Sequence, residues 1–345
     1  MDIKQAIAKV IIHQDLSEDE MVDVMNEIMG GVATPAQIGS FITALRMKGE
    51  TVAEITGAVR VMRAKVTPIA TGVDINQGGI LVDTCGTGGD SSGTFNVSTA
   101  SAFVVAGAGM MVAKHGNRSV SSHCGSADVL EAAGVSLNLT PEQIGRCVRE
   151  VGIGFLFAPA LHGAMKYAIG PRREIGIRTI FNILGPLTNP AGANVQVVGV
   201  FAADLTEPLA EVLGRLGSKR ALVVHGEGGL DELTVTGSTR ISDLNQGQVS
   251  TYAITPEQLG LTRASLADLQ GGATPLESAA QMRAIFGGEQ GAKRDMVLIN
   301  SGAALMAAGV SADLQAGVNK AAEIIDSGKA LAKLEQLVSF CRELS

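Results

Sequence analysis

The sequence is poor in aromatic residues: it has no Trp, and Phe, Trp and Tyr together make up 3% of the chain. Proteins that stack on single-stranded nucleic acids or on sugars depend on such side chains, so this kind of binding surface is disfavoured. Positive charge is also in short supply, since the formal net charge is −7. An acidic chain is a poor general binder of nucleic acid, and we expect phosphate recognition to be local, with no nucleic-acid partner.

Cysteines and long apolar runs are scarce as well. The four cysteines (Cys85, Cys124, Cys147 and Cys341) show no C-x-x-C spacing, which disfavours zinc and indicates reduced thiols. The longest apolar run, residues 102–113, is too short and too rich in glycine to cross a bilayer. The first residues also lack the basic and then apolar layout of a signal peptide. We therefore predict a cytoplasmic protein that has no membrane partner.

The N-terminal part of the chain has the pattern of helices alone. Two pairs, Ser17 with Glu20 and Thr51 with Glu54, have the spacing of capping boxes that begin helices. A short polar stretch rich in glycine, residues 71–79, has the composition of a linker. The length of 345 residues is in keeping with one small and one large domain.

Beyond the linker, apolar runs alternate with helical segments. The runs that we expect to form buried strands are residues 80–82, 110–113, 154–157, 195–201 and 221–224. Strands that alternate with helices are typical of an α/β fold with a mostly parallel sheet flanked by helices. Residues 161–194 show no strand pattern, and we expect them to return to the helical domain and to line the cleft. The predicted division is a small all-helical N-terminal domain, 1–70 completed by about 161–194, and a large α/β domain made of 75–160 and 195–345.

A glycine cluster follows the first predicted strand, where residues 83–90 read Asp-Thr-Cys-Gly-Thr-Gly-Gly-Asp. Glycines at the carboxyl end of a strand let backbone N–H groups converge on an anion. The cluster is neither a Walker loop nor a dinucleotide fingerprint, because no Lys-Ser/Thr follows and Ser91 stands where a third glycine is needed. A plain glycine-rich turn is the alternative. Asp90 favours a ribose phosphate over a bare phosphate, since an acid in a phosphate loop needs a cation or sugar hydroxyls nearby.

Two more polar stretches lie close to predicted strand ends. Residues 94–99, Thr-Phe-Asn-Val-Ser-Thr, open a helix, where hydroxyls are most often simple N-caps. Residues 114–118, Lys-His-Gly-Asn-Arg, follow a predicted strand and precede Ser119, Ser121 and Ser122. A solvated charge cluster is the alternative here, but open α/β sheets bind ligands at this edge. Lys114 and Arg118 suit pyrophosphate oxygens, and Asn117 suits an amine or carboxylate of a second substrate.

An acidic pair, Asp231 and Glu232, follows the glycine-rich residues 226–229. Adjacent carboxylates on a loop are usually plain surface charge. Here they come after a predicted strand and face the same edge of the sheet as the glycine cluster. Paired carboxylates are what Mg²⁺ recruits when it binds together with a diphosphate.

With these stretches the sequence resembles the anthranilate phosphoribosyltransferase family of tryptophan biosynthesis. The most specific parts are residues 86–90, residues 114–118 continued by 125–128, and the stretch 181–190, Phe-Asn-Ile-Leu-Gly-Pro-Leu-Thr-Asn-Pro. The resemblance runs from the N-terminal helices to residue 308. It implies a helical domain hinged to an α/β domain, an active site between them, and a homodimer formed through the helices.

The resemblance also implies the substrates, phosphoribosyl pyrophosphate (PRPP) and anthranilate, and Mg²⁺ as the cofactor. Together with the motifs, it assigns to PRPP the residues Gly86, Thr87, Gly88, Gly89, Asp90, Thr94, Asn96, Val97, Ser98, Thr99, Lys114, Asn117, Arg118, Ser119, Ser122 and Ser126. Anthranilate is expected against Gly86, His115, Asn117, His162, Arg172, Gly185 and Pro186. The expected metal ligands are Ser98, Asp231 and Glu232, and the expected catalytic residues are His115, Asn117 and Arg172.

The reaction implied is displacement of pyrophosphate at C1 of the ribose by the neutral arylamine. Such a reaction needs positioning and charge stabilisation more than deprotonation, so we expect no obligatory general base and an orienting role for His115. Two alternatives share the architecture. A pyrimidine-nucleoside phosphorylase would need a nucleobase pocket in place of the surroundings of Arg172, and a nucleic-acid-binding relative would need basic surface and would have a degraded donor site.

Overall fold

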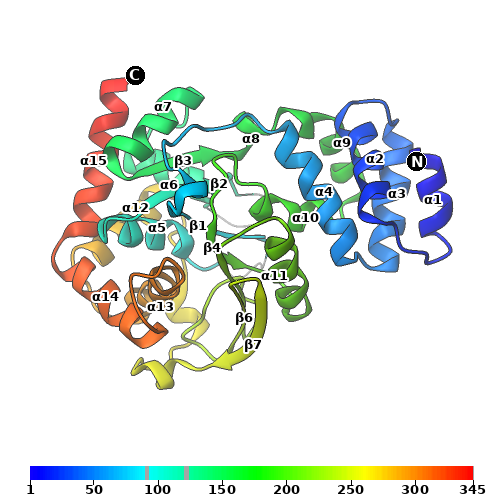
Figure 1. Ribbon diagram of the computed structural model, residues 1–345. Helices are drawn as coiled ribbons and strands as arrows, with labels where there is room; N and C mark the ends of the chain where they lie inside the picture. Colours follow the sequence, from blue (N-terminus) through cyan, green and yellow to red (C-terminus); the bar gives the residue numbers. More distant parts are fainter. Residues whose placement is uncertain (90–92, 120–123, 345) are drawn as a thin grey trace.

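The chain consists of a helical part and a larger part built on a β-sheet, which lie side by side in Figure 1. The computed structural model describes residues 1–89, 93–119 and 124–344. The helical part begins with four helices: α1 (Ile3–Val10), α2 (Glu18–Met29), α3 (Pro35–Lys48) and α4 (Val52–Lys65). Each begins at a capping box, including the two predicted at Ser17 and Thr51. The reciprocal hydrogen bonds of these boxes satisfy N–H groups that have no partner within the helix.

Within the described residues, a seven-stranded sheet has the order β3-β2-β1-β4-β5-β6-β7. Its strands are β1 (Leu81–Gly86), β2 (Met111–Gly116), β3 (Ile153–Phe157), β4 (Val195–Gly199), β5 (Arg220–Gly226), β6 (Thr239–Asn245) and β7 (Gln248–Ile254). Strands β1 to β5 pair with one another in parallel, and β6 and β7 continue the sheet beyond β5 as an antiparallel hairpin. The predicted α/β class with a mostly parallel sheet is therefore confirmed.

The strands β1 and β2 extend further than the sequence indicated. They continue to Gly86 and Gly116 instead of ending at residues 82 and 113. Asp83 and Lys114, which we had expected in loops, are thus buried strand residues. The prediction was wrong here because polar side chains interrupt the apolar run, although the sheet buries them.

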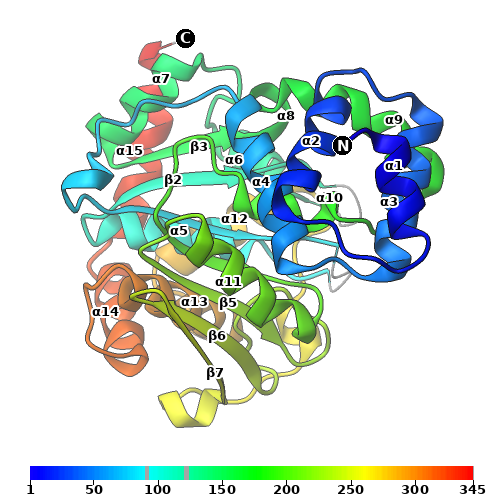
Figure 2. The same cartoon turned by 45° about the vertical axis from the view of Figure 1, so that its right-hand side comes forward.

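Helices cover both faces of the sheet (Figure 2). One face packs against α5 (Val97–Gly107) and α13 (Ala292–Ala307), with α12 (Pro275–Phe286), α14 (Leu314–Asp326) and α15 (Lys329–Leu344) further out. The other face packs against α11 (Thr206–Arg215), which in turn contacts α4. Successive residues of β4 point to opposite cores, Val197 to the first and Val198 to the second, as the pleat of a strand requires.

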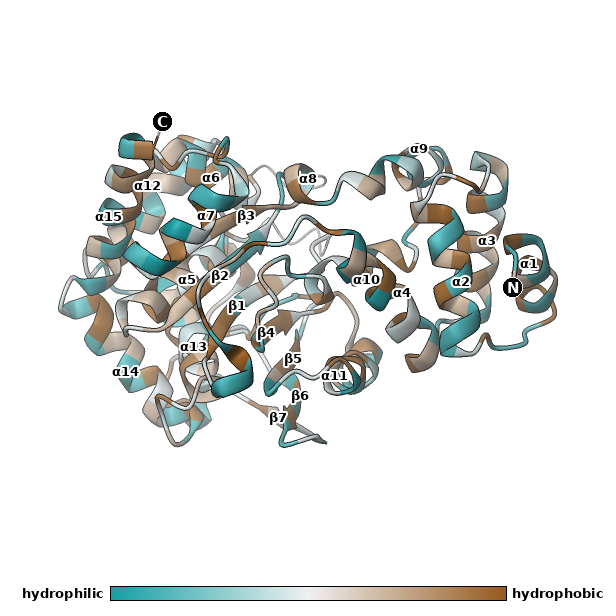
Figure 3. Ribbon diagram, turned by 45° about the horizontal axis from the view of Figure 1, so that its top comes forward, coloured by the Kyte–Doolittle hydropathy of each residue, from teal (hydrophilic) through white to brown (hydrophobic). Residues whose placement is uncertain are grey.

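Shorter helices complete the sheet-bearing part at its β3 edge. They are α6 (Ser126–Ala133) and α7 (Pro141–Arg146), and α7 continues into a π-helical turn, η2 (Cys147–Val151). Figure 3 shows the mixture of hydrophobic and hydrophilic residues that lets such helices face the core on one side and solvent on the other. Throughout the described residues, no helix combines the length and apolar character needed to cross a membrane.

The segment between β3 and β4 returns to the N-terminal helices. It contains α8 (Ala158–Leu161), η3 (Gly163–Met165), α9 (Lys166–Ile175), α10 (Phe181–Leu184) and η4 (Gly185–Leu187), and no strand, as expected. Helix α9 packs against α2 and α3, and α10 packs against α4. The Arg63 Nε of α4 donates a 2.8 Å hydrogen bond to the carbonyl oxygen of Leu187. This segment therefore connects the helices to the carboxyl ends of the strands.

Candidate active site

The residues predicted for PRPP and for the metal lie at or after the carboxyl ends of β1, β2 and β5, and β4 lies between β1 and β5. Because these four strands are parallel, their carboxyl ends meet at one edge of the sheet. Open α/β sheets bind ligands at this edge, where loops diverge from the strand ends.

The glycine cluster and the acidic pair lie in direct contact, although 143 positions separate Gly88 from Asp231. The N–H of Gly88 donates a 2.7 Å hydrogen bond to Asp231 Oδ2. A Cβ at Gly86 would lie 2.5 Å from the same oxygen, and a Cβ at Gly199 would overlap the carbonyl oxygen of Asp231. Gly86 and Gly199 must be glycine because Asp231 approaches both of them closely. The glycine cluster is therefore more than a simple turn.

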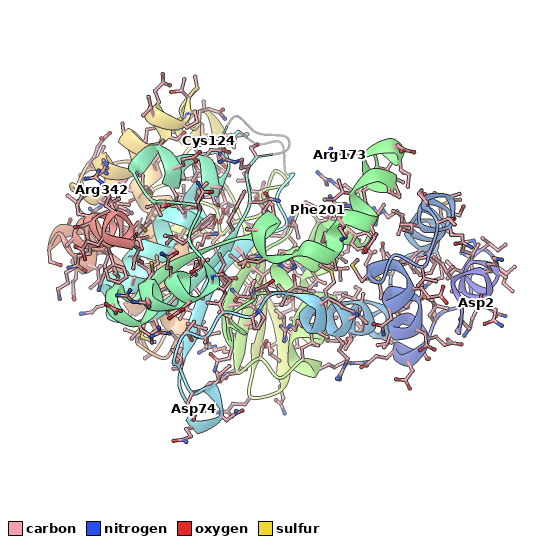
Figure 4. All side chains as sticks on the ribbon, turned by 90° about the horizontal axis from the view of Figure 1, so that it is seen from above. Asp2, Asp74, Cys124, Arg173, Phe201 and Arg342 are labelled. Carbon is pink, nitrogen blue, oxygen red and sulfur yellow. The ribbon has the colours of Figure 1, made fainter. Side chains whose placement is uncertain are left out.

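Thr87 fixes the glycine cluster to the end of β4. Its N–H donates to the carbonyl oxygen of Gly199 at 2.9 Å, and its Oγ1 accepts from the N–H of Phe201 at 3.2 Å. The guanidinium of Arg178 donates to the carbonyl oxygen of Gly89 and lies over the Phe201 ring, 4.2 Å from its centroid. Phe201 is labelled in Figure 4, between the sheet-bearing part and the N-terminal helices. Arg178 was missed by sequence reasoning, because an isolated Arg after a helix carries no local signal.

Glu232 and Ser98 line one small cavity beneath the acidic loop. The other residues that line it are Thr84, Cys85, Ser101, Val197 and Asn300. Ser98 is the second residue of α5, and Thr84 of β1 holds this helix start with a 2.8 Å hydrogen bond from its Oγ1 to the carbonyl oxygen of Ser98. The three predicted metal ligands are thus brought to neighbouring positions: Asp231 at the glycines, and Glu232 and Ser98 at the cavity.

These ligand types fit Mg²⁺ better than zinc. Among the described residues, no group of three or more His, Cys, Asp and Glu side chains is placed to hold a metal ion. Two adjacent carboxylates and a hydroxyl form an incomplete set of oxygen ligands. Mg²⁺ usually keeps several waters and binds one or two carboxylates together with substrate phosphates. A protein site for Mg²⁺ therefore needs to supply only some of its oxygen ligands.

The start of α5 lies beside the start of α6. Asn96, at the N-cap of α5, donates from Nδ2 to the carbonyl oxygen of Cys124 at 3.0 Å, and Thr99 Oγ1 donates to Ser126 Oγ at 3.0 Å. Thr99 is fully buried, whereas Asn96, Ser98 and Ser126 are partly exposed. Two helix starts that converge in this way offer N–H groups to an anion.

The stretch 114–118 divides between the sheet and α6. Lys114 is buried, with its Nζ donating to the carbonyl oxygen of His115 at 3.1 Å. Arg118 lies over the Phe157 ring and pairs with Asp128 at 2.8 Å and Glu131 at 2.9 Å. Its charge is therefore already engaged by two carboxylates, which any phosphate contact would have to share.

The remaining residues predicted for PRPP differ in their surroundings, and two of them are not among the residues that the structure describes. The N–H of Ser119 donates to Asp128 Oδ2 at 3.1 Å, and Asn117 is exposed, its Oδ1 accepting from the N–H of Arg118 at 2.7 Å. The predicted residues Asp90 and Ser122 lie outside the described residues. Thr94, another predicted contact, forms a β-bridge with Gln270, and Val97 is buried at the start of α5.

Asp83 is a fully buried carboxylate that sequence reasoning did not assign to the site. It accepts hydrogen bonds from the N–H of His115 at 3.0 Å and from Asn189 Nδ2 at 2.8 Å. Burial raises the pKa of the Asp83 carboxyl, and the nearby charge of Lys114 opposes this rise. Asn189 also donates to the carbonyl oxygen of Ala113 at 2.8 Å, so the pair joins β1, β2 and the chain after η4. Asp83 precedes the glycines and Asn189 belongs to the stretch 181–190, but nothing in the sequence pairs the two residues.

His115 and His162 form a buried pair, with their Nε2 atoms 3.1 Å apart and their ring centroids 5.1 Å apart. Burial lowers the pKa of His115 to about 3, with His162 adding to the effect, and burial lowers the pKa of His162 to about 4. A backbone hydrogen bond with Gly185 opposes the lowering of the His115 pKa.

Arg172 belongs to α9, and its guanidinium lies over the Phe181 ring of α10, 5.4 Å from the centroid. Burial lowers the pKa of Arg172. The neighbouring turn is fixed by Gln196, whose Nε2 donates to the carbonyl oxygen of Pro186 at 2.9 Å. Figure 4 labels Arg173, the next residue of α9 after Arg172. The residues predicted for anthranilate thus lie in the segment from α8 to η4, at the end of β1, and at and just after the end of β2.

Comparisons with known proteins cover nearly the whole chain. The helical bundle domain of a glycosyl transferase family matches residues 4–66, and the a/b domain of a glycosyl transferase family matches residues 78–331. Anthranilate phosphoribosyltransferase from Desulfotalea psychrophila is 63% identical over 99% of this chain and 97% of its own, and the one from Geotalea uraniireducens is 60% identical over 99% and 100%.

Solved structures agree with the sequence comparisons. The crystal structure of anthranilate phosphoribosyltransferase from Thermus thermophilus has a TM-score of 0.92 and 44% identity, over 98% of this chain and 99% of that one. The enzyme from Saccharomyces cerevisiae, in complex with PRPP and Mg, has a TM-score of 0.88 and 26% identity, over 99% and 98%. The family and enzyme class that the sequence resemblance implied are therefore confirmed: the chain belongs to the anthranilate phosphoribosyltransferases, within a glycosyl transferase family that combines a helical bundle with an a/b domain.

Proposed function

We propose that this chain transfers the phosphoribosyl group of PRPP to the amino nitrogen of anthranilate, with release of pyrophosphate, at the carboxyl edge of β1, β2, β4 and β5. The observation that carries the proposal is the contact between the glycine cluster and the acidic pair, through the hydrogen bond from Gly88 to Asp231. An anion-binding backbone and a carboxylate pair serve one ligand together only when that ligand brings both a phosphate and a cation.

The donor would lie over residues 86–89 and the starts of α5 and α6. The backbone N–H of Gly89 and those of the two helix starts would bind the diphosphate, because the N–H groups of Thr87 and Gly88 donate to Gly199 and Asp231. The partly exposed polar side chains there are Asn96, Ser98 and Ser126. Lys114 would contribute positive potential from its buried position. Arg118 would act weakly, because Asp128 and Glu131 engage its guanidinium.

Mg²⁺ is proposed as the cofactor, held by Asp231, Glu232 and Ser98, whose oxygens form the incomplete ligand set described above. When bound it would neutralise charge on the leaving diphosphate. The chain's own contribution is to keep the Asp231 carboxylate fixed against the glycine cluster, with Glu232 next to it in the chain, so that little reorganisation is needed when PRPP arrives.

Anthranilate would lie between the histidine pair, the Gly185-Pro186 turn and Arg172. The guanidinium of Arg172 suits the carboxylate of the aromatic acid, and the Phe181 ring beneath it keeps its plane in place. His115, with a pKa lowered to about 3, is too weak a base to take a proton from the amine at neutral pH. Its role is to orient, through hydrogen bonds to His162 and Gly185.

The association and location of the chain are also part of the proposal. A homodimer through the helical part is supported by four large apolar side chains that are 60–77% exposed: Ile11, Ile12, Val32 and Met47. The proposed domain division, 1–70 with about 161–194 against the rest, is supported by the packing of α9 on α2 and α3. A cytoplasmic location is supported by four buried cysteines, none of which forms a disulfide within the described residues.

The test is a fluorescence assay of anthranilate consumption by the purified chain. We expect the signal to fall only when PRPP and Mg²⁺ are both present, and Asp231→Asn to need a higher Mg²⁺ concentration for half-maximal rate. Thymidine with phosphate serves as the comparison substrate. Phosphorolysis of thymidine without anthranilate consumption would overturn the proposal.

A further inference from the structure

Asn300, on α13, binds the backbone of the residue that follows the acidic pair. It is buried, with 3% of its surface exposed. Its Oδ1 accepts from the N–H of Leu233 at 3.0 Å, and its Nδ2 donates to the carbonyl oxygen of Leu233 at 2.8 Å and to that of Met296 at 2.9 Å. One carboxamide thus satisfies both backbone groups of a loop residue, much as a neighbouring strand would, and ties them to a long buried helix.

The opposite side of the acidic loop is fixed by the strands. Gly88 donates to Asp231, a Cβ at Gly199 would overlap Asp231, and a Cβ at Gly226 would lie 2.8 Å from the carbonyl oxygen of Glu232. The loop 231–233 is therefore held between glycines of the sheet on one side and Asn300 on the other. Asn300 and Glu232 also line the same small cavity.

We propose that Asn300 is a positioning residue for the acidic pair, which sets the affinity for PRPP with Mg²⁺ by anchoring Leu233 to α13. The inference rests on the metal role of Asp231 and Glu232 put forward under the proposed function. Two neighbouring carboxylates repel each other, and a loop without an anchor would let them separate. Groups that hold metal ligands in place typically change metal affinity or activity by roughly 10- to 100-fold when they are removed.

A merely structural role for Asn300 makes a different prediction. Loss of a buried, fully hydrogen-bonded amide would lower stability in any event. It would reduce the amount of folded protein without changing how the folded fraction responds to Mg²⁺. The two roles therefore separate in ligand affinity and in the division between KM and kcat.

The experiment compares Asn300→Ala with wild type and with Ser301→Ala, which removes a buried hydroxyl that has no hydrogen-bond partner from the next position of the same helix. Calorimetric titration of PRPP is carried out at several Mg²⁺ concentrations, alongside steady-state kinetics and thermal unfolding. We expect Asn300→Ala to weaken PRPP binding by roughly 10- to 100-fold at low Mg²⁺, to recover part of the loss at high Mg²⁺, and to keep its KM for anthranilate. Ser301→Ala should bind PRPP as the wild type does.

A folded Asn300→Ala protein with the wild-type Mg²⁺ dependence of PRPP binding would overturn the inference. If Asn300→Ala does not fold, Asn300→Ser, which keeps a hydroxyl at this position, is judged by the same readouts. Asp231→Asn, measured in parallel, separates the two proposals. If Asp231→Asn changes the Mg²⁺ dependence and the Asn300 variants do not, the positioning role alone fails; if Asp231→Asn also leaves it unchanged, the proposed metal site fails and the inference fails with it.

Discussion

The buried histidine pair makes the stability of this chain sensitive to mild acid. In the folded state the pKa of His115 is about 3 and that of His162 about 4, against an ordinary value of 6.5, because burial penalises the charged ring. The unfolded chain therefore binds protons first as the pH falls. The stability contributed by the two rings is complete above pH 6.5 and is lost as the pH falls from there toward the folded-state pKa values.

The size of the loss at pH 5 depends mainly on the unfolded state. At pH 5 the proton stabilises each unfolded histidine by about 2 kcal/mol. This pH lies about 1.5 units below the pKa of an unfolded histidine, and each unit is worth about 1.4 kcal/mol. The folded rings have gained almost nothing, because their pKa values lie below 5. We therefore expect the pair to lower the free energy of unfolding by about 4 kcal/mol between pH 7 and pH 5.

The assay is urea unfolding followed by far-ultraviolet circular dichroism at both pH values, for wild type and for the double variant with His115→Gln and His162→Gln. Other titrating groups, including the buried Asp83, affect both proteins alike, so the difference between the two pH dependences isolates the pair. The variant should lose about 4 kcal/mol less than wild type. Equal losses in the two proteins would mean that the rings titrate normally in the folded chain, and the reasoning from burial would be refuted.

Three further changes test other parts of the structure. Arg172→Ala should raise the KM for anthranilate at least about tenfold and leave the KM for PRPP nearly unchanged, because the bidentate partner of the carboxylate is lost; steady-state kinetics with each substrate varied in turn measures this. Gly199→Ala should lower the melting temperature and weaken PRPP binding, since its methyl group would overlap the Asp231 carbonyl, whereas Gly170→Ala, where a Cβ meets nothing within 4 Å, should do neither. Met47→Asp should shift the sedimentation coefficient toward that of a monomer, because Met47 is 77% exposed on the helical part; an unchanged coefficient would argue against that surface as the dimer contact.

The central strands and the site edge were predictable because their signals are local. Apolar runs marked the positions of the parallel strands, and polar motifs followed them at the carboxyl ends. Parallel strands place such motifs at one edge without further information. The contact between Gly88 and Asp231 is the outcome that this reasoning anticipated, although the assignment of individual residues to PRPP and anthranilate stays a prediction.

The hairpin β6–β7 was missed because it lies at the edge of the sheet. Most residues of β7 are exposed, so the strand needs no apolar run, and its alternating polar residues read like a loop. The turn between the strands places Gln246 and Gly247 at positive φ, which two-residue hairpins require. Helices α12 and α13 were missed too. All but three of the sixteen residues of α13 are buried, which removes the amphipathic period that identifies a surface helix.

Contacts that depend on distant parts of the chain could not be predicted. Asn300 meets Leu233 across 67 positions, and Asp83 meets Asn189 across 106. Even within one region, the pairing of Arg118 with Asp128 and Glu131 of α6 was not evident from the residues next to Arg118, whose assignment to PRPP stays a prediction. In each case the side chain's role depends on which element packs against it, and a single sequence does not carry that information.

The position of the acidic loop follows from glycines that line the edge of the sheet. Gly86 of β1 and Gly199 of β4 are paired in register, and Gly226 ends the next strand, β5. A Cβ at any of the three would lie against Asp231 or Glu232, so side chains here would displace the carboxylates from the glycine cluster. Glycine is needed at these strand ends for the space it leaves, and that space lets the chain after β5 cross back over β4 and β1. The same pairing that sets the register of the sheet therefore also sets the distance between the anion-binding backbone and the acidic pair.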